Sequence, residues 1–101
     1  MCSNYRPPKS EVLAQFDIGP PSFAFGECYP GSIGPFLASV KPDAWLPGTF
    51  GLLPHWAEPK LAKMTYNARS ETVGEKPSFR NAWRNRQLCV IPVQAFYEPN
   101  Y

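Results

Sequence analysis

The spacing of apolar residues along this chain predicts two short helices. In the first, apolar side chains at positions 12, 13 and 16 follow Ser10, which predicts two turns capped by Ser10 and ended by the Gly-Pro-Pro sequence at 19–21. In the second, apolar side chains at positions 79, 82 and 83 follow Ser78, and the arginines at 80, 84 and 86 lie largely off that face. We expect this second capped helix to end near Gln87.

The other apolar segments predict strands. Residues 22–40 contain brief apolar stretches separated by Pro-Gly and Gly-Pro sequences, which predict two short strands. Residues 49–53 predict a buried strand that the following proline closes. Residues 88–91 are continuously apolar, as is typical of a strand buried on both faces. Pro92 ends or bulges this strand, and the strand continues over residues 93–97. These elements, without long helical crossovers, indicate an α+β fold with mixed, mainly antiparallel strands and short helices.

Composition indicates one domain or part of one. The chain has 101 residues, and 44% of them are hydrophobic, which is enough for one packed core and too little for two. No apolar run is long enough to cross a bilayer, and the first residues lack the hydrophobic segment of a signal peptide. We therefore expect a cytoplasmic protein with no membrane contact.

Charge permits DNA binding but does not establish it. The net charge is +2, and residues 51–101 carry seven Lys/Arg against four Asp/Glu, whereas residues 1–50 carry three against four. A basic second half fits a phosphate-binding surface and fits a merely solvated surface equally well.

The cysteines and the histidine do not form a metal site. Cys2, Cys28 and Cys89 are odd in number and far apart, which excludes a disulfide framework and a zinc knuckle and indicates a reducing compartment. We expect Cys28 and Cys89 to be buried apolar residues, and His55 to be a partly exposed loop residue. No metal and no cofactor is predicted.

Cys2 has the most distinctive chemistry in the chain. The initiator methionine is normally removed before a residue as small as cysteine, which leaves an α-amine and a thiol on one carbon. The amine can condense with an aldehyde to an imine, and the thiolate can close that imine to a five-membered thiazolidine. By itself, a cysteine at position 2 is more typical of an incidental residue, so other motifs must decide.

Several motifs in the chain resemble the SOS-response-associated peptidase (SRAP) family. The matches are to its WGLxPxW segment (FGLLPHW, 50–56), its NARxET motif (NARSET, 67–72), its FR pair (79–80), its RCLxPxxxFYE motif (LCVIPVQAFYE, 88–98) and its PG turn (YPG, 29–31). Order and spacing agree over nearly the whole chain. The resemblance implies a SRAP-like fold and a sensor of abasic sites in single-stranded DNA that bonds them covalently through Cys2. The family name also records a proposed thiol autopeptidase.

The resemblance implies three catalytic residues. Cys2 would be the covalent nucleophile, and Asn67 would hold the amino-terminal residue and the sugar through its amide. Glu98 would move protons on the amine or the deoxyribose oxygen, which a carboxylate can do when burial raises its pKa. Without the motif, Asn67 would be read as a turn residue and Glu98 as a surface carboxylate.

The resemblance also implies three DNA contacts. Arg69 and Arg80 would bind phosphates, although Arg69 also fits a structural ion pair with Glu71. Trp56 would stack on a base beside the lesion, whereas the other tryptophans, Trp45 and Trp83, are assigned to the core.

The chain departs from the family pattern at several points. Asn4 replaces the arginine of the usual MCGR opening, Phe50 replaces the first tryptophan of WGLxPxW, and Pro99 stands where a tryptophan is expected after FYE. A later family histidine that assists ring opening is absent. We therefore expect residues 1–101 to be the N-terminal portion of a single SRAP-like domain: a fragment, a truncated product, or one piece whose C-terminal half is a separate partner.

Two other functions stay open from the sequence. One is a truncated, noncatalytic module that binds single-stranded DNA or a protein partner. The other is a cysteine hydrolase acting on external peptides, which ranks last because this stretch lacks a convincing Cys–His pair.

Overall fold

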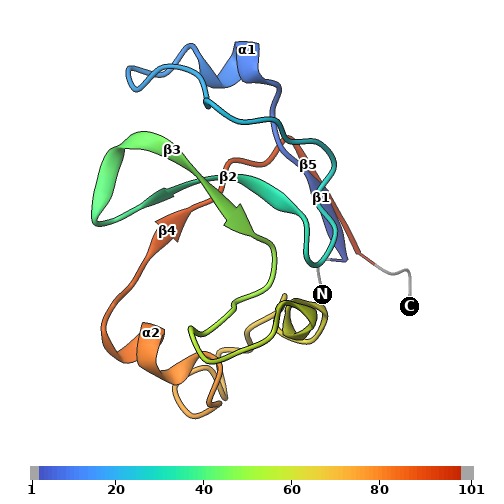
Figure 1. Cartoon of the computed structure of the whole chain (residues 1–101), viewed down its shortest axis with the longest axis vertical. Coiled ribbons are helices and arrows are strands. Elements are labelled where there is room, and N and C mark those ends of the chain that lie inside the picture. Colours follow the sequence, from blue (N-terminus) through green and yellow to red (C-terminus); the bar gives the residue numbers. More distant parts are fainter. Residues whose placement is uncertain (1–2, 99–101) are drawn as a thin grey trace.

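The computed structural model describes residues 3–98, and it has the expected α+β architecture with antiparallel sheets and short helices (Figure 1). One sheet has two strands and the other has three, in the order β3–β2–β4. The strands are β1 (Asn4–Arg6), β2 (Ile33–Ala38), β3 (Lys41–Thr49), β4 (Cys89–Val90) and β5 (Ala95–Tyr97). The helical elements are α1 (Ser10–Leu13), the 3₁₀ helix η1 (Pro59–Lys63) and α2 (Arg80–Arg84).

The β2–β3 hairpin is the longest pairing, and it corrects the strand expected at 49–53. Strand β3 ends at Thr49, opposite Ile33, and the chain then turns at Gly51, which has a φ of 116°. Pro35 lies opposite Pro47. Since neither proline has an N–H, this pair fits only a non-hydrogen-bonded position of an antiparallel ladder. Prolines are tolerated in β3 because it is an edge strand.

Only one of the two strands expected within residues 22–40 forms. Strand β2 is the confirmed one, whereas Phe23 and Phe25 lie in an irregular segment where their rings pack against each other, with centroids 6.0 Å apart. At the end of this segment, Cys28 makes an isolated antiparallel bridge with Tyr5. The segment is therefore tied to β1 at a single position.

Both predicted helices exist, but they are shorter than expected and the predicted caps are wrong. The N-cap of α1 is Lys9 and that of α2 is Phe79, and neither side chain makes a capping hydrogen bond. After α2, Arg86 adopts a φ of 52°, which ends the helical backbone before Gln87. No helix within residues 3–98 is long and apolar enough to cross a membrane.

The core is small, and burial differs from the sequence prediction at several residues. The buried hydrophobic residues of the described chain are Tyr5, Leu13, Cys28, Trp45 and Ala62. Trp45 and Cys28 are thus confirmed as core, and Phe16 meets the Trp45 ring edge-on at 6.0 Å.

Trp83 and the β4 strand are exposed, contrary to the prediction. Trp83 is 57% exposed, Val90 is 63% exposed, and Cys89 is exposed as well. Strand β4 pairs with β2 through two residues only, Val90 opposite Leu37 and Cys89 opposite Ala38. A continuous apolar run was expected to be covered on both faces, but burial requires covering elements, and residues 3–98 provide none over β4.

Candidate functional site

The two ends of the described chain meet in the β1–β5 sheet (Figure 1). Asn4 lies opposite Tyr97 and Arg6 opposite Ala95. The Ser3 N–H donates to the Tyr97 carbonyl at 2.8 Å, and the Ser3 hydroxyl donates to the same oxygen at 3.1 Å. Because Ser3 follows Cys2 and Tyr97 precedes Glu98, the immediate neighbours of two predicted catalytic residues are in contact. Cys2 itself lies outside the described residues.

Strand β1 is held from both sides. On the side away from β5, the Tyr5 N–H donates to the Cys28 carbonyl at 3.0 Å and the Cys28 N–H returns a bond to the Tyr5 carbonyl at 2.8 Å. On the β5 side, the Gln94 N–H donates to the Arg6 carbonyl at 2.8 Å. The strand that follows Cys2 is therefore bonded on both edges, by β5 on one side and by Cys28 at a single position on the other.

Aromatic rings connect β1 to the segment that carries Asn67. The buried Tyr5 ring meets the edge of Phe50 at a centroid distance of 5.2 Å, and Phe50 meets Tyr66 at 5.8 Å. Such edge-to-face pairs each add about 0.5–1.5 kcal/mol beyond the area they bury. Asn67, which is half-buried, directly follows Tyr66. Strand β1 is thus paired with the strand that precedes Glu98 and linked through Phe50 to the segment of Asn67.

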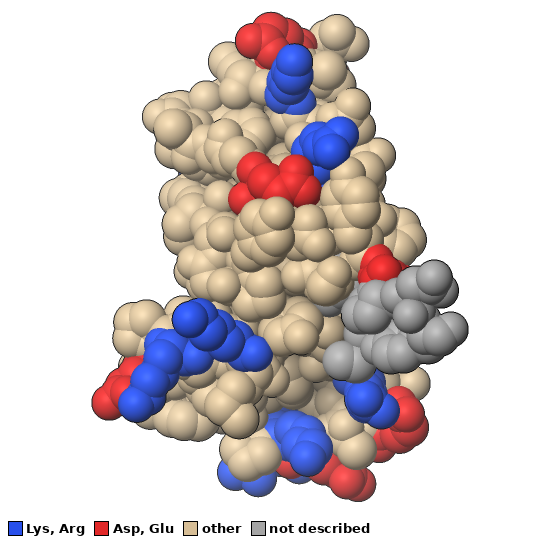
Figure 2. Space-filling model, turned by 90° about the vertical axis from the view of Figure 1, so that its right-hand side faces the viewer, with Lys and Arg blue, Asp and Glu red and all other residues tan. Residues whose placement is uncertain are grey.

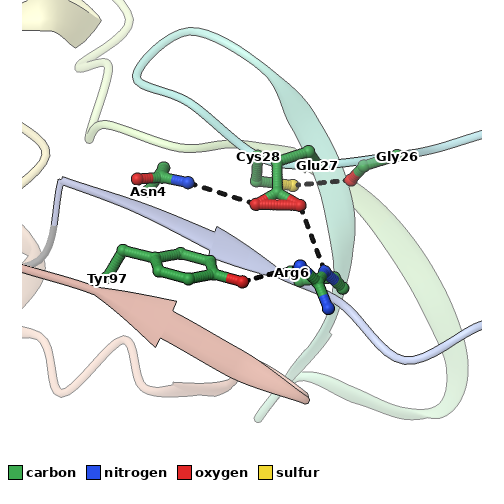
Figure 3. A network of polar contacts seen from close by, with 6 residues as sticks. All are labelled: Asn4, Arg6, Gly26, Glu27, Cys28 and Tyr97. Carbon is green, nitrogen blue, oxygen red and sulfur yellow. Dashed lines mark hydrogen bonds and ion pairs between the residues drawn. The ribbon is translucent and has the colours of Figure 1, made fainter.

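A polar network covers the outer face of β1, and sequence reasoning missed it (Figure 3). The Glu27 carboxylate accepts hydrogen bonds from Asn4 Nδ2 at 3.1 Å and from Arg6 Nε at 3.3 Å. Arg6 Nη2 donates to the Tyr97 hydroxyl at 2.6 Å, and the guanidinium carbon lies 5.9 Å from the Tyr97 ring centroid. Positions 4 and 6 share a face of any strand, but no local signal assigns Glu27 to them.

Cys28 is a structural residue rather than a nucleophile. Its thiol donates to the Gly26 carbonyl at 3.5 Å, as Figure 3 shows, and lies 3.7 Å from the Ile33 carbonyl. Burial raises the pKa of the Cys28 thiol; a hydrogen bond with Tyr5 lowers it in part, and the negative charge of Glu27 raises it further. The raised pKa disfavours the thiolate, which is the reactive form of a cysteine.

The predicted DNA-binding residues are all at the surface. Trp56 is 59% exposed and lies in a turn, which is closed by a hydrogen bond from the Ala57 N–H to the Pro54 carbonyl. Arg69 is exposed in the loop after Asn67, and Arg80 is exposed at the start of α2. A cavity of about 520 Å³ is lined by residues that precede the two arginines, Ala68 and Phe79, together with aromatic and aliphatic residues of the sheet.

The basic side chains do not form one continuous area on the face shown in Figure 2. They appear there as separate groups, several with acidic side chains beside them. Near Arg69, the Glu71 pKa is lowered chiefly by a bond from its own backbone N–H, then by the Ser70 hydroxyl, and less by the charge of Arg69. On the face shown, the basic side chains therefore form no single patch.

Metal-ligating residues do not cluster within residues 3–98. No group of three or more His, Cys, Asp or Glu side chains in this part of the chain could hold a metal ion. His55 lies exposed in a turn, as expected.

Comparison with known proteins gives a family match over most of the chain. The family model for SOS response associated peptidase (SRAP) matches residues 20–101. The abasic site processing protein YoqW of Bacillus subtilis is 46% identical over 50 residues, which are 48% of this chain and 22% of that protein. The abasic site processing protein YoaM of the same organism is 44% identical over a segment of the same length.

A solved structure matches the fold. A protein from Bordetella bronchiseptica superimposes with a TM-score of 0.77 at 31% sequence identity, over 98% of this chain and 51% of that chain. The chain thus spans about half the length of the solved relative.

Proposed function

This chain belongs to the SOS response associated peptidase (SRAP) family, and from that membership we propose that it processes abasic sites in DNA. Its curated relatives carry the name abasic site processing protein. We further propose that the site is read in single-stranded DNA and captured covalently by Cys2.

The observation that carries the proposal is the β1–β5 pairing. A nucleophile at the second residue needs a proton-transfer group beside it, and the Ser3–Tyr97 hydrogen bond of 2.8 Å joins the segments of Cys2 and Glu98. The ring contacts support the inclusion of Asn67, because Tyr66, the residue before it, packs on Phe50, and Phe50 packs on Tyr5 of β1.

The proposed reaction is a condensation. After removal of Met1, the α-amine of Cys2 attacks the aldehyde carbon of the ring-opened deoxyribose, and loss of one water gives an imine. The Cys2 thiolate then adds to the imine carbon, and the nitrogen takes up a proton to complete a thiazolidine. Glu98 would supply and accept these protons, and Asn67 would hold the amine and the sugar through its amide. Removal of Met1 by the chain itself, the proposed autopeptidase step, would produce the same amine.

The proposed DNA contacts follow from surface position. Arg69 and Arg80 would each bind a phosphate, and Trp56 would stack on a base next to the lesion, since the exposed faces of all three side chains are accessible to a strand. The location proposed for the protein stays the cytoplasm, as expected from the sequence.

We also propose that residues 1–101 act as the N-terminal portion of one SRAP domain, completed by a C-terminal half. Support comes from the apolar side chains that stay uncovered around β4 and β5. Val90, Leu88 and Phe96 are each more than 60% exposed, with values of 63%, 62% and 62%. An exposed two-residue strand with apolar neighbours is a suitable edge for a further strand.

The test is adduct formation with an oligonucleotide that carries one abasic site. The protein should give a heat-stable DNA–protein adduct with the mass of the two components minus one water. Cys2→Ala should abolish the adduct and Cys2→Ser should nearly do so, because a hydroxyl is a far weaker nucleophile. Glu98→Gln should slow formation by about 10²-fold, the usual contribution of a proton-transfer group.

Cys89→Ala is the matched control, because it removes an exposed thiol from a different part of the fold and should leave the adduct unchanged. If the chain is folded and gives no Cys2-dependent adduct, the chain is a noncatalytic module. A chain that reacts only when the C-terminal half is added would support the completion of the domain by that half.

A further inference from the structure

We propose that Arg6 is a preorganised phosphate contact for a nucleotide flanking the abasic site. This inference rests on the proposed function and adds a binding residue to it. Arg6 lies outside the motifs that suggested Arg69 and Arg80, and it belongs to the network of Figure 3.

The guanidinium of Arg6 is fixed while remaining accessible. Its Nε donates to Glu27 at 3.3 Å, its Nη2 donates to the Tyr97 hydroxyl at 2.6 Å, and its plane lies near the Tyr97 ring. The side chain is nevertheless 51% exposed. A guanidinium carries five N–H groups, so these two bonds leave others without a partner in the described part of the chain.

Glu27 explains why the arginine is held in one orientation. Its carboxylate is bound on one oxygen by Arg6 and on the other by Asn4, so it acts as a fixed acceptor rather than a mobile counterion. An arginine side chain that is already ordered loses less conformational entropy when it binds a further group. The free edge of a planar fork matches the oxygens of a phosphate.

The position of Arg6 fits a nucleotide next to the lesion. Arg6 is four residues from Cys2, so even a fully extended chain separates their Cα atoms by at most roughly 13–14 Å. A cavity of about 360 Å³ opens beside Arg6, and Lys9, Ser10 and Gln94 also line it. A strand captured at Cys2 could therefore pass over Arg6 toward a second cation, Lys9.

The experiment measures binding of a fluorescein-labelled single strand without an abasic site, by anisotropy over a range of salt concentrations. Arg6→Ala should weaken binding by about three- to tenfold, as loss of a partly exposed charge-assisted hydrogen bond does. It should also reduce the slope of log K against log salt by about 0.7, the value for one phosphate on a single strand. Arg6→Lys keeps the charge and loses the planar fork, so its affinity should lie between those of the wild type and Arg6→Ala.

Lys41→Ala is the matched control. Lys41 is 54% exposed and pairs with Asp43 at 3.5 Å, so it resembles Arg6 in exposure, pairing and charge, but it lies in the β2–β3 hairpin away from β1 (Figure 1). Its replacement should leave affinity and salt slope nearly unchanged. Glu27→Gln, which removes a carboxylate that competes with phosphate, should preserve or tighten binding.

The outcomes separate this inference from the proposed function. If the wild-type chain binds no single strand, the Arg6 contact fails, whereas the proposed function is judged separately by the Cys2 adduct. If the wild type binds and Arg6→Ala behaves like Lys41→Ala, only the Arg6 contact is overturned. If Glu27→Gln weakens binding as much as Arg6→Ala while the salt slope stays constant, the network is a structural brace between β1 and β5, and the phosphate role is refuted.

Discussion

Replacement of Gly51 by alanine should strongly destabilise the chain, because both the backbone and the space at this position exclude a side chain. The φ of 116° lies where residues other than glycine are strained, which costs about 1–3 kcal/mol. A Cβ would lie 2.7 Å from Ala62 Cα and 2.8 Å from Ala62 Cβ, and closer still to the Ala62 carbonyl oxygen.

Ala62 has little freedom to move away. It is fully buried in η1. The segment after Gly51 and the segment after Ala62 are joined by two hydrogen bonds: the Leu52 N–H donates to the Thr65 carbonyl at 3.1 Å, and the Thr65 hydroxyl donates to the Leu52 carbonyl at 2.8 Å. Forced displacement of packed backbone adds about 1–3 kcal/mol. The two costs sum to about 2–6 kcal/mol, a large part of the 5–15 kcal/mol typical of a folded domain.

Thermal and urea unfolding followed by circular dichroism measure this effect. At roughly 4–8 °C per kcal/mol for a chain of this size, Gly51→Ala should lower Tm by about 8 °C or more. Gly26→Ala is the control, because its Cβ would meet nothing within 4 Å and its φ is not positive, so Tm should hardly change. Equal Tm values for the two variants would refute the backbone strain and the close contact described at Gly51.

Three further predictions concern the cysteines and Glu71. At neutral pH a thiol reagent should modify Cys89 and spare Cys28, and Cys89→Ala should remove a rapidly labelled thiol, whereas Cys28→Ala should not. Because folding raises the Cys28 pKa, the free energy of unfolding should fall as pH rises through the alkaline range, and a pH-independent value would contradict this. Folding lowers the Glu71 pKa, so its contribution is present above the ordinary carboxyl pKa and is lost as pH falls through the lowered one. Any Tm difference between wild type and Glu71→Gln should therefore shrink in acid, and it should be small because the carboxylate is exposed.

Local pattern predicted the elements better than their ends or their burial. The class of fold and both helix positions were confirmed, because they follow from apolar spacing within a few residues, and the assignment of Trp45 to the core was confirmed as well. Strand β3 was not predicted, since its prolines resemble turns until β3 is known to be an edge strand. Trp83 and Cys89 were assigned to the core because apolar side chains usually are, but burial depends on what lies over them.

The candidate site was likewise predictable only in part. The roles of Cys2, Asn67 and Glu98 came from motif resemblance and remain predictions. The Glu27–Arg6 contact was invisible to sequence reasoning, because it joins residues 21 positions apart and the charge pattern of either segment is unremarkable. Such contacts arise from tertiary packing, which a single sequence does not reveal.

The β1–β5 pairing has a consequence for the order of events during synthesis. Asn4 and Tyr97 stand at nearly opposite ends of the chain, so this sheet has a very long loop to close and cannot form before the last described strand has left the ribosome. The amino terminus is therefore accessible to methionine removal on the nascent chain while Glu98 has not yet been made. Folding of such high contact order also tends to be slow. In the proposed reaction, the aminothiol would therefore meet Glu98 only after β5 has been synthesised, which delays activation of a reactive group until the protein around β1 exists.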